Sequence, residues 1–543
     1  MRITTVRVLV QTVSFALFLA FVIITDFSLL KGFPVSLFLE VDPLVAIATA
    51  ITTHQVYQSL VWALVLLIPT LFLGRFFCNW ICPMGIMLQF TGWLARRGRP
   101  VKERIDANRY RPLFAFKYYV LAFILVAALF GSLQNGLLDP IPTIHRSFSI
   151  AVLPVASMLG ADVYVRPHLH HLTWLVGGLL VFFLGMNLVI PRFFCRVLCP
   201  LGATLGFLSR FSLWRIDRNV ARCTDCDLCL KSCEGAADPH SALRKSECFV
   251  CFNCIEDCPE DALSFAWLPQ AQTPERGGEL REANVARRGL MLGGVSGALF
   301  YAFSRASGDT TENFRPEVIR PPGSVAEHDF LARCIKCDQC IRVCPTNVLQ
   351  PAALEAGIEG LWTPIMNMRV GYCELNCTLC GQVCPTGAIQ KIGIDQKLGS
   401  GPFAELGPVV VGTAFYDRGR CLPWAMDTPC VVCEEVCPVS PKAIYTRQVS
   451  TTDRWGAPLV LERPYIDPTR CIGCGICEHE CPVVDRRAVY VTAVGESRSK
   501  ERSLLLEESG KRTAGGTVGT THRPATIERF ESLTELLDRP RQV

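Results

Sequence analysis

The sequence predicts a multi-domain protein in which an α-helical membrane bundle is joined to small α+β domains. Long apolar segments lie before residue 200, cysteines recur in regular groups after it, and one section of the chain repeats itself. A chain of 543 residues, of which 50% are hydrophobic, has room for several domains and is more apolar than most soluble proteins. Each of these features is taken in turn below.

Four apolar segments before residue 200 have lengths near that of a membrane-spanning helix. They are Val8–Leu30, Leu60–Phe77, Tyr118–Leu138 and Leu172–Pro191. Pro69 is expected to kink the second segment. No small-residue cleavage site follows the first segment, so we expect a span rather than a cleaved signal peptide.

The formal net charge of +5 is informative through its placement. Basic residues precede the first span, crowd residues 96–117 between the second and third, and follow the fourth, whereas Gly32–Gln55 has none. The positive-inside rule therefore predicts a multi-pass membrane protein whose N-terminus and residues 200–285 are cytoplasmic. The membrane is expected to be the bacterial inner membrane. This loop is a topology signal, and no nucleic-acid binding is expected.

The membrane half is an internal duplication. Leu39-Glu40-Val41-Asp42-Pro43 is echoed by Gly136-Leu137-Leu138-Asp139-Pro140. A second echo joins Arg75-Phe76-Phe77-Cys78 to Arg192-Phe193-Phe194-Cys195, and Cys82-Pro83 to Cys199-Pro200. Each repeat contains a span, an outer loop with Asp-Pro, a second span and a C-x-x-x-C-P motif. Two repeats of one orientation are expected to be related by an axis along the membrane normal.

The chain contains 28 cysteines, and 24 of them form six groups of four. The first two groups have the spacing C-x-x-C-x-x-C-x-x-x-C, in which three thiolates bind one [4Fe–4S] cluster and the fourth binds its neighbour. This rule predicts one cluster on Cys223, Cys226, Cys229 and Cys258 and another on Cys248, Cys251, Cys254 and Cys233. Zinc sites and disulfide scaffolds rarely have this spacing.

Four further groups follow, which brings the predicted total to six [4Fe–4S] clusters in bacterial-ferredoxin-like domains. The pairing of these four groups is left open: neighbours pair, or the first pairs with the fourth and the second with the third. No C-x-x-C-H motif is present, so covalent haem is not expected. The groups are Cys334, Cys337, Cys340, Cys344; Cys373, Cys377, Cys380, Cys384; Cys421, Cys430, Cys433, Cys437; and Cys471, Cys474, Cys477, Cys481.

The last four cysteines are Cys78, Cys82, Cys195 and Cys199, which end the two membrane repeats. If the repeats face each other, these thiols converge and could bind a further iron–sulfur centre or an extra metal centre, or act as a catalytic redox-active dithiol system near quinol. The alternative is that they only support the adjacent ferredoxin domain.

Polar residues of the outer loops are secondary candidates. Asp42, Asp139 and Glu40 could accept protons from a quinol. Histidines at a membrane interface are usually solvated or hydrogen-bonded, and a haem or quinone role is the alternative for His145, His168, His170 and His171.

The domain prediction follows from these motifs. Residues 1–215 form the membrane domain, 216–268 a two-cluster ferredoxin domain, 269–288 a linker, 289–305 a fifth span, 320–495 a four-cluster domain and 496–543 a flexible tail. Arg287-Arg288 before the fifth apolar run resembles a twin-arginine export signal, although a basic pair before an interfacial helix is the alternative. Export would make the four-cluster domain periplasmic.

Two resemblances follow from these motifs. Arg192–Gly202 and the two cysteine groups after it resemble the NapH-type membrane ferredoxins, with which NosR and CcoG share the paired C-x-x-x-C-P motifs. The segments Leu331–Pro345, Gly371–Ile389 and Cys471–Val483 resemble NapG/MauM-type periplasmic polyferredoxins. The chain thus looks like a fusion of two quinol-dehydrogenase partners. In that family, the membrane part is thought to oxidise quinol and the polyferredoxin to pass electrons to a periplasmic redox protein.

The resulting hypothesis is a quinol dehydrogenase or electron-transfer oxidoreductase component. Its partners would be membrane lipid, the quinone pool and a periplasmic cytochrome or reductase. The protein itself could be a subunit of a redox complex. A CcoG-like copper or thiol reductase in cofactor assembly is the second hypothesis, and a regulatory iron–sulfur scaffold is the third. The motifs indicate no hydrolytic or group-transfer site.

Overall fold

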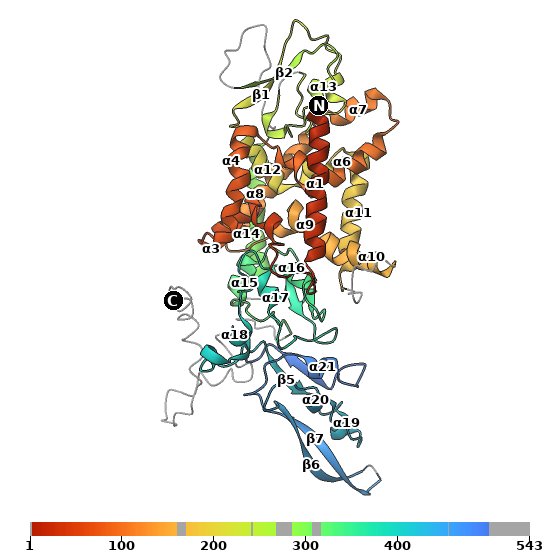
Figure 1. Cartoon of the computed structure of the whole chain (residues 1–543), viewed down its shortest axis with the longest axis vertical. Helices are drawn as coiled ribbons and strands as arrows, with labels where there is room; N and C mark the ends of the chain where they lie inside the picture. Colours follow the sequence, from red (N-terminus) through yellow and green to blue (C-terminus); the bar gives the residue numbers. More distant parts are fainter. Residues whose placement is uncertain are drawn as a thin grey trace. The chain divides into compact units, whose positions relative to one another are not determined.

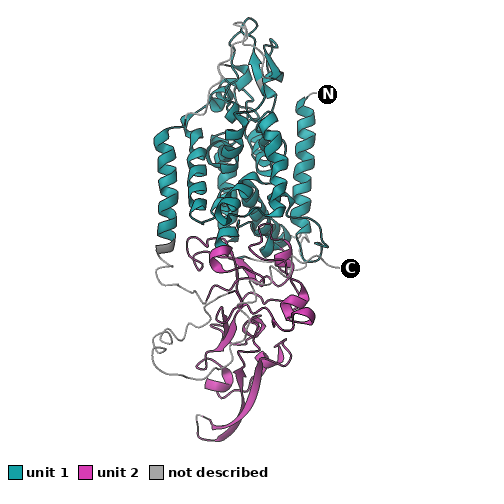
Figure 2. Ribbon diagram, turned by 90° about the vertical axis from the view of Figure 1, so that its left-hand side faces the viewer, with its two compact units in different colours: residues 1–307, 331–342 teal, residues 308–330, 343–543 magenta. Residues whose placement is uncertain are grey.

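The structure is a computed structural model that describes residues 3–159, 170–240, 243–267, 285–306, 317–453 and 455–498 (Figure 1). The chain forms two compact units (Figure 2). Unit 1 contains residues 1–307 and Leu331–Arg342, and unit 2 contains residues 308–330 and 343–543. The segment Leu331–Arg342, which the sequence assigns to the four-cluster domain, thus packs with unit 1. Most of the predicted linker and tail lie outside the described residues.

Unit 1 is mainly helical and carries one antiparallel pair of strands. The strands are β1 (Trp214–Arg218) and β2 (Leu263–Trp267). The helices are α1 (Ile3–Ile24), α2 (Leu37–Glu40), α3 (Pro43–Thr53), α4 (Leu64–Leu73), α5 (Phe77–Trp80), α6 (Pro83–Arg96), α7 (Val101–Asn108), α8 (Phe116–Leu129), α9 (Pro140–Arg146), α10 (Leu153–Met158), α11 (Thr173–Val189), α12 (Pro200–Ser209), α13 (Asn253–Glu256), α14 (Arg287–Ala306) and α16 (Gln339–Arg342). Helix α15 (Glu327–Arg333) crosses the boundary between the units.

Unit 2 consists of short helices and three antiparallel strand pairs. The pairs are β3 (Leu349–Pro351) with β4 (Pro364–Met366), β5 (Thr413–Tyr416) with β8 (Val489–Thr492), and β6 (Ile444–Thr452) with β7 (Pro458–Ile466). The helices are α17 (Leu379–Gln382), α18 (Ile394–Leu398), α19 (Leu422–Ala425), α20 (Val432–Glu435) and α21 (Ile476–His479).

Among the described residues, two helices are long and apolar enough to cross a membrane, Ile3–Ile24 and Pro112–Leu129. They correspond to the first and third predicted spans. The second predicted span begins as a 3₁₀ turn at Gln58 and continues as α4, with Pro69 inside the helix. The fourth is the 17-residue helix α11. The second and fourth predicted spans therefore differ from the first and third, because the second is interrupted and the fourth is short.

The two repeats have matching backbone at their cysteine motifs. Helices α6 and α12 both begin at the proline of C-x-x-x-C-P, with Cys82 and Cys199 as the preceding residues. Cys82 has φ −60° and ψ 119°, and Cys199 has φ −64° and ψ 108°. A proline at the first helical position supplies the required φ and needs no hydrogen-bond acceptor for its nitrogen. Sequence duplication thus becomes structural duplication.

The β1–β2 end of unit 1 is fastened to the start of α1. The Thr4 hydroxyl donates a hydrogen bond to Glu256 at 2.7 Å, and Arg7 donates to the Asn253 side chain at 2.7 Å. Glu247 is buried and accepts hydrogen bonds from Lys117 and Tyr118, with Arg75 as a further ion-pair partner. Figure 1 shows β1, β2 and α13 at the same end of the bundle as the N-terminus.

The segment Leu331–Arg342 packs against the other end of unit 1. Lys336 donates to the Gln134 side chain at 2.6 Å, and Gln339 donates to the carbonyl of Val35, beyond the end of α1, at 3.1 Å. The 22 residues of α1 separate the two ends by about 33 Å. Cysteine-bearing segments therefore lie at both ends of the helical part of unit 1.

Helix α14 packs on α8 through glycines spaced four residues apart. A Cβ atom on Gly293 would lie 2.6 Å from the Tyr119 carbonyl oxygen, and one on Gly297 would lie 2.5 Å from that of Phe123. Small residues at this spacing let two helices approach closely, as in membrane helix pairs. Because Phe130 stacks on Tyr301 at the far end, α14 runs parallel to α8 along the bundle.

Neighbouring glycines test this contact. Gly293→Ala should destabilise unit 1 by about 1–3 kcal/mol, since the added methyl group meets backbone rather than a mobile side chain. Gly294→Ala is the matched control, because its Cβ would be 3.6 Å from a Val126 methyl group, an ordinary contact. Thermal unfolding in detergent measures both. Equal midpoints for the two variants would contradict the close α8–α14 contact.

Candidate functional site

The first two cysteine groups assemble as the ferredoxin spacing predicts. Thiols of Cys223, Cys226, Cys229 and Cys258 line one small cavity. The other four cysteines, Cys233, Cys248, Cys251 and Cys254, lie within electrostatic range of one another in the neighbouring core. The fourth cysteine of each group, which is predicted to bind the neighbouring cluster, accepts a hydrogen bond from a backbone amide. Ala237 N lies 3.4 Å from Cys233 Sγ, and Ala262 N lies 3.3 Å from Cys258 Sγ.

In unit 2, the fourth cysteine of a group joins the three cysteines of its sequence neighbour. Cys344 lines a cavity with Cys373, Cys377 and Cys380. Cys481 lines another with Cys421, Cys430 and Cys433. Cys437 in turn lies within electrostatic range of Cys471, Cys474 and Cys477. Of the pairings left open by the sequence, the structure has the one between neighbours.

These thiol groups fit [4Fe–4S] clusters. Each complete set offers four sulfur ligands, which is the number that a [4Fe–4S] cluster takes from the protein. Burial raises the pKa of the Cys421 and Cys474 thiols to about 12. Iron must therefore displace protons from these sulfurs, so that cluster insertion and folding of the domain are coupled.

The side chains of Lys397 and Tyr416 lie close to the sulfurs of predicted cluster ligands. Lys397 is buried, and its ammonium group donates to Cys373 Sγ at 3.3 Å and to the carbonyls of Glu374 and Cys377. The Tyr416 hydroxyl lies 3.0 Å from Cys433 Sγ. Hydrogen bonds and charge at the sulfurs set cluster potentials, so these two residues are expected to tune them. The cysteine pattern contains no signal for either residue.

The four membrane cysteines also come together. Cys78, Cys82, Cys195 and Cys199 are buried in one hydrophobic core and lie within electrostatic range of one another. Gly202 donates its backbone N–H to Cys199 Sγ at 3.1 Å. In the part of the chain that the structure describes, no three His, Cys, Asp or Glu side chains lie close enough to hold a single metal ion.

An aromatic side chain from the ferredoxin loop is inserted beside these cysteines. Phe249 lies between the cluster ligands Cys248 and Cys251 in sequence and belongs to the same core as the four thiols. The guanidinium carbons of Arg75 and Arg192 lie 4.7 Å and 5.3 Å from the centre of its ring. These arginines occupy equivalent positions in the two repeats, so Phe249 bridges the duplication. Sequence analysis did not single out Phe249.

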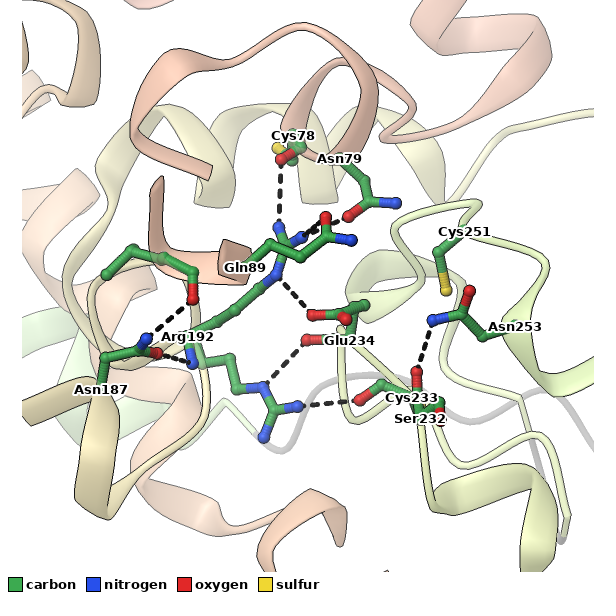
Figure 3. A network of polar contacts seen from close by, with 12 residues as sticks. Cys78, Asn79, Gln89, Asn187, Arg192, Ser232, Cys233, Glu234, Cys251 and Asn253 are labelled. Atoms are coloured by element: carbon green, nitrogen blue, oxygen red, sulfur yellow. Dashed lines mark hydrogen bonds and ion pairs between the residues drawn. The ribbon is translucent and has the colours of Figure 1, made fainter. Parts of the chain in front are cut away.

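Arg192 fastens the second repeat to the first and to the ferredoxin domain (Figure 3). It donates to Glu234 at 2.6 Å, to Gln89 at 2.7 Å and to the Cys78 carbonyl at 3.3 Å. Asn187 orients it by accepting a hydrogen bond from its backbone N–H at 2.6 Å. Residue 192 thus links a thiol-bearing loop to the residue that follows the cluster ligand Cys233.

The predicted proton acceptors Asp42, Asp139 and Glu40 lie in two different environments. Asp42 and Asp139 are fully buried and share a side-chain hydrogen bond. Two carboxyl groups in contact away from water cannot both ionise, so the pair retains a proton. Glu40 instead binds the Ser36 hydroxyl at 2.5 Å.

The histidines do not form a cluster in the described residues. His145 Nδ1 lies 2.9 Å from the carbonyl oxygen of Cys337, so it positions a cysteine-bearing loop. His170 is buried and His171 is exposed. His168 lies outside the described residues.

Comparisons with protein families agree with this arrangement. A family described as a 4Fe-4S binding domain matches residues 56–102, 171–219 and 380–399. The first two segments contain the two C-x-x-x-C-P motifs. A 4Fe-4S dicluster domain matches residues 333–388, and another 4Fe-4S binding domain matches residues 462–483. The chain is therefore an iron–sulfur electron-transfer protein.

Relatives extend this assignment. The methylamine utilization ferredoxin-type protein MauM of Methylorubrum extorquens is 33% identical over 239 residues, which are 43% of this chain and 97% of the relative. The putative electron transport protein YccM of Escherichia coli is 31% identical over 36% of this chain and 51% of its own length. The regulatory protein NosR of Pseudomonas aeruginosa is 28% identical over 37% of this chain, and the match spans 28% of NosR.

The near-complete coverage of MauM shows that the chain belongs to the MauM family of ferredoxin-type proteins. The similarity to NosR and YccM agrees with the predicted resemblance to NosR-type membrane ferredoxins. No solved structure matches the chain.

Because the fourth cysteine of a group in unit 2 joins the neighbouring set, the arrangement predicts which double cysteine replacements remove one cluster and which remove two. Replacing both Cys437 and Cys474 by alanine should remove about four irons per chain, because both serve one cluster. Replacing Cys437 and Cys433 should remove about eight. Iron and sulfide analysis of anaerobically purified protein measures this. The opposite pattern would mean that each group keeps its own fourth cysteine.

Lys397→Met should make the potential of the cluster held by Cys373, Cys377, Cys380 and Cys344 roughly 50–100 mV more negative, because a charged hydrogen bond to sulfur is lost. Redox titration followed by paramagnetic resonance measures the shift. Lys391→Met is the matched control, since that lysine is exposed. An unchanged potential in Lys397→Met would show that the ammonium group does not act on the cluster.

Proposed function

We propose that this protein is a membrane-bound iron–sulfur protein that oxidises quinol and passes the electrons through six [4Fe–4S] clusters to a periplasmic redox protein. The observation that carries the proposal is the presence of cysteine-bearing loops at both ends of the helical part of unit 1. Residues 223–258 lie at the start of α1, and Cys334, Cys337 and Cys340 belong to the segment that packs beyond its end.

The proposed topology has four spans in two repeats and α14 as a fifth. The 20 residues of α14 are about 30 Å long, close to the thickness of the hydrocarbon core. Its parallel packing on α8 supports a second crossing of the chain toward the polyferredoxin. Arg287-Arg288 begins this helix, where a twin-arginine signal would carry folded iron–sulfur domains to the periplasm.

The four membrane thiols are the proposed site of an additional iron–sulfur centre near the quinol. Both C-x-x-x-C-P motifs lie in segments that match a 4Fe-4S binding domain. Arg75 and Arg192 supply positive charge that would offset anionic thiolates in this buried place. A centre held by Cys78, Cys82, Cys195 and Cys199 would supply a one-electron carrier between the repeats.

Quinol oxidation also needs proton acceptors, because it releases two protons with its two electrons. Asp42 and Asp139 form the buried acidic pair of the outer half, and three of their four carboxylate oxygens accept no hydrogen bond from a donor group in the described structure. A pair that already shares one proton can take up and release another. The electrons leave singly toward an oxidised redox protein, which is the terminal oxidant.

The second hypothesis, copper or thiol reduction in cofactor assembly, needs neither the acidic pair nor the four cysteine groups after residue 320. YccM is named as an electron transport protein and NosR as a regulatory protein, and these functions are those of the relatives. A quinone-dependent experiment separates all three hypotheses.

The test uses full-length protein purified anaerobically in detergent with its clusters oxidised and the oxidant removed. A menaquinol or ubiquinol analogue should reduce the clusters rapidly. The quadruple variant C78S/C82S/C195S/C199S should lose this reaction. It should keep the clusters that the other 24 cysteines bind, as cluster absorbance reports. Asp42→Asn with Asp139→Asn should slow it without changing iron content.

Clusters that stay oxidised in excess quinol would overturn the quinol-dehydrogenase proposal. Copper binding that requires the same four cysteines would then favour the assembly hypothesis. A chain that neither binds copper nor reacts with quinol would favour the regulatory scaffold.

A further inference from the structure

Unit 1 has a cavity of about 700 Å³ at the end of the bundle where the ferredoxin domain packs. Its walls come from the start of α1, from α6 and from the loop around Cys233. The cavity adjoins the four-thiol site, because its lining residues Gln89 and Glu234 both accept hydrogen bonds from Arg192 (Figure 3). Apart from Cys233, which is a predicted cluster ligand, the proposed electron-transfer function gives its lining residues no role.

The polar wall is strongly basic. Arg7, Arg96, Arg97, Arg104 and Lys231 line the cavity, and Glu234 is its only acidic residue. Glu234 is already ion-paired with Arg192 at 2.6 Å. The cavity thus has an excess of positive charge.

The hydrogen-bonding groups of the wall are mainly donors. Arg96 Nη1 is buried and makes no hydrogen bond in the described structure. The side-chain oxygen of Gln89 already accepts from Arg192 at 2.7 Å and from Gln11 at 2.7 Å. A ligand that offers only acceptor oxygens and carries negative charge satisfies such a site. A quinol, which is neutral and must donate its hydroxyl protons, does not.

The opposite wall is apolar and opens onto the outer surface of the bundle. Val8, Phe90 and Trp93 line the cavity and are 51%, 62% and 55% exposed. Arg97 lies over the Trp93 ring at 5.3 Å. A tryptophan beside arginine at the end of an apolar helix is typical of the membrane–water interface. A basic pocket beside such a surface suits a head group whose acyl chains continue along the protein.

We infer that this cavity binds the phosphate diester of an anionic glycerophospholipid, with its acyl chains along α1 and α6. Basic pockets between helices on the cytoplasmic side bind anionic head groups in this way. The lipid would bridge α1, α6 and the Cys233 loop, and so fasten the ferredoxin domain to the membrane domain. The inference rests on the membrane placement proposed above, and not on quinol oxidation.

The experiment is native mass spectrometry of delipidated full-length protein, with clusters loaded, titrated with dioleoyl phosphatidylglycerol. One lipid should be retained, and Arg96→Gln should weaken its retention about fivefold through loss of one charge. Lys102→Gln is the matched control, because Lys102 is exposed on α7 and does not line the cavity. Arg96→Lys should restore most of the retention, which separates charge from folding.

Competition identifies the ligand. Dioleoyl phosphatidylcholine and a short-chain ubiquinone analogue should not displace the retained lipid, and neither should millimolar inorganic phosphate. Equal retention by the wild type and Arg96→Gln would overturn the inference. Displacement by the quinone analogue would assign the cavity to quinone, and displacement by phosphate to a free anion, and either result would overturn the lipid assignment. Quinol-driven cluster reduction is measured separately, so failure of one proposal leaves the other tested on its own.

Discussion

The position of Phe249 between Arg75 and Arg192 is the contact on which the arrangement of unit 1 depends. Two buried guanidinium groups from equivalent points of the duplication meet one ring from the ferredoxin loop. Buried charges are costly unless they are paired, and here Glu247 and Glu234 supply the partners from the same ferredoxin domain. Each arginine thus takes its carboxylate partner from that domain. The two repeats and the first cysteine-rich domain therefore form one structural unit.

This constraint explains how two similar repeats contact one ferredoxin domain. Each repeat has the same proline-started helix after its second cysteine, yet the two arginines have different acidic partners, Glu247 for Arg75 and Glu234 for Arg192. The two equivalent arginines are thus paired with two glutamates that are not equivalent, both from the ferredoxin domain. The same core continues from Phe249 past the four thiols to Cys337, which places cysteine residues along one buried column of unit 1.

Cysteine spacing was sufficient to predict the composition of the first two thiol groups, because the crossing of the fourth ligand is a local property of the ferredoxin loop. Spacing could not decide the pairing in unit 2, since that depends on contacts between segments far apart in sequence. The apolar runs located the helices, but hydropathy could not reveal the 3₁₀ start at Gln58 or the 17-residue limit of α11. Phe249 and Lys397 carry no sequence signal, because their roles arise from docking of loops whose relative positions no motif encodes.

The central claim is that electrons from membrane quinol reach the cysteine-bearing segment at the far end of α1. The most direct measurement uses proteoliposomes with all molecules in one orientation, quinol in the bilayer and an impermeant oxidant such as ferricyanide on the polyferredoxin side only. The account predicts quinol-dependent reduction of ferricyanide, which is lost when Cys334, Cys337 and Cys340 are replaced by alanine. Reduction that continues at the same rate in that variant would contradict it.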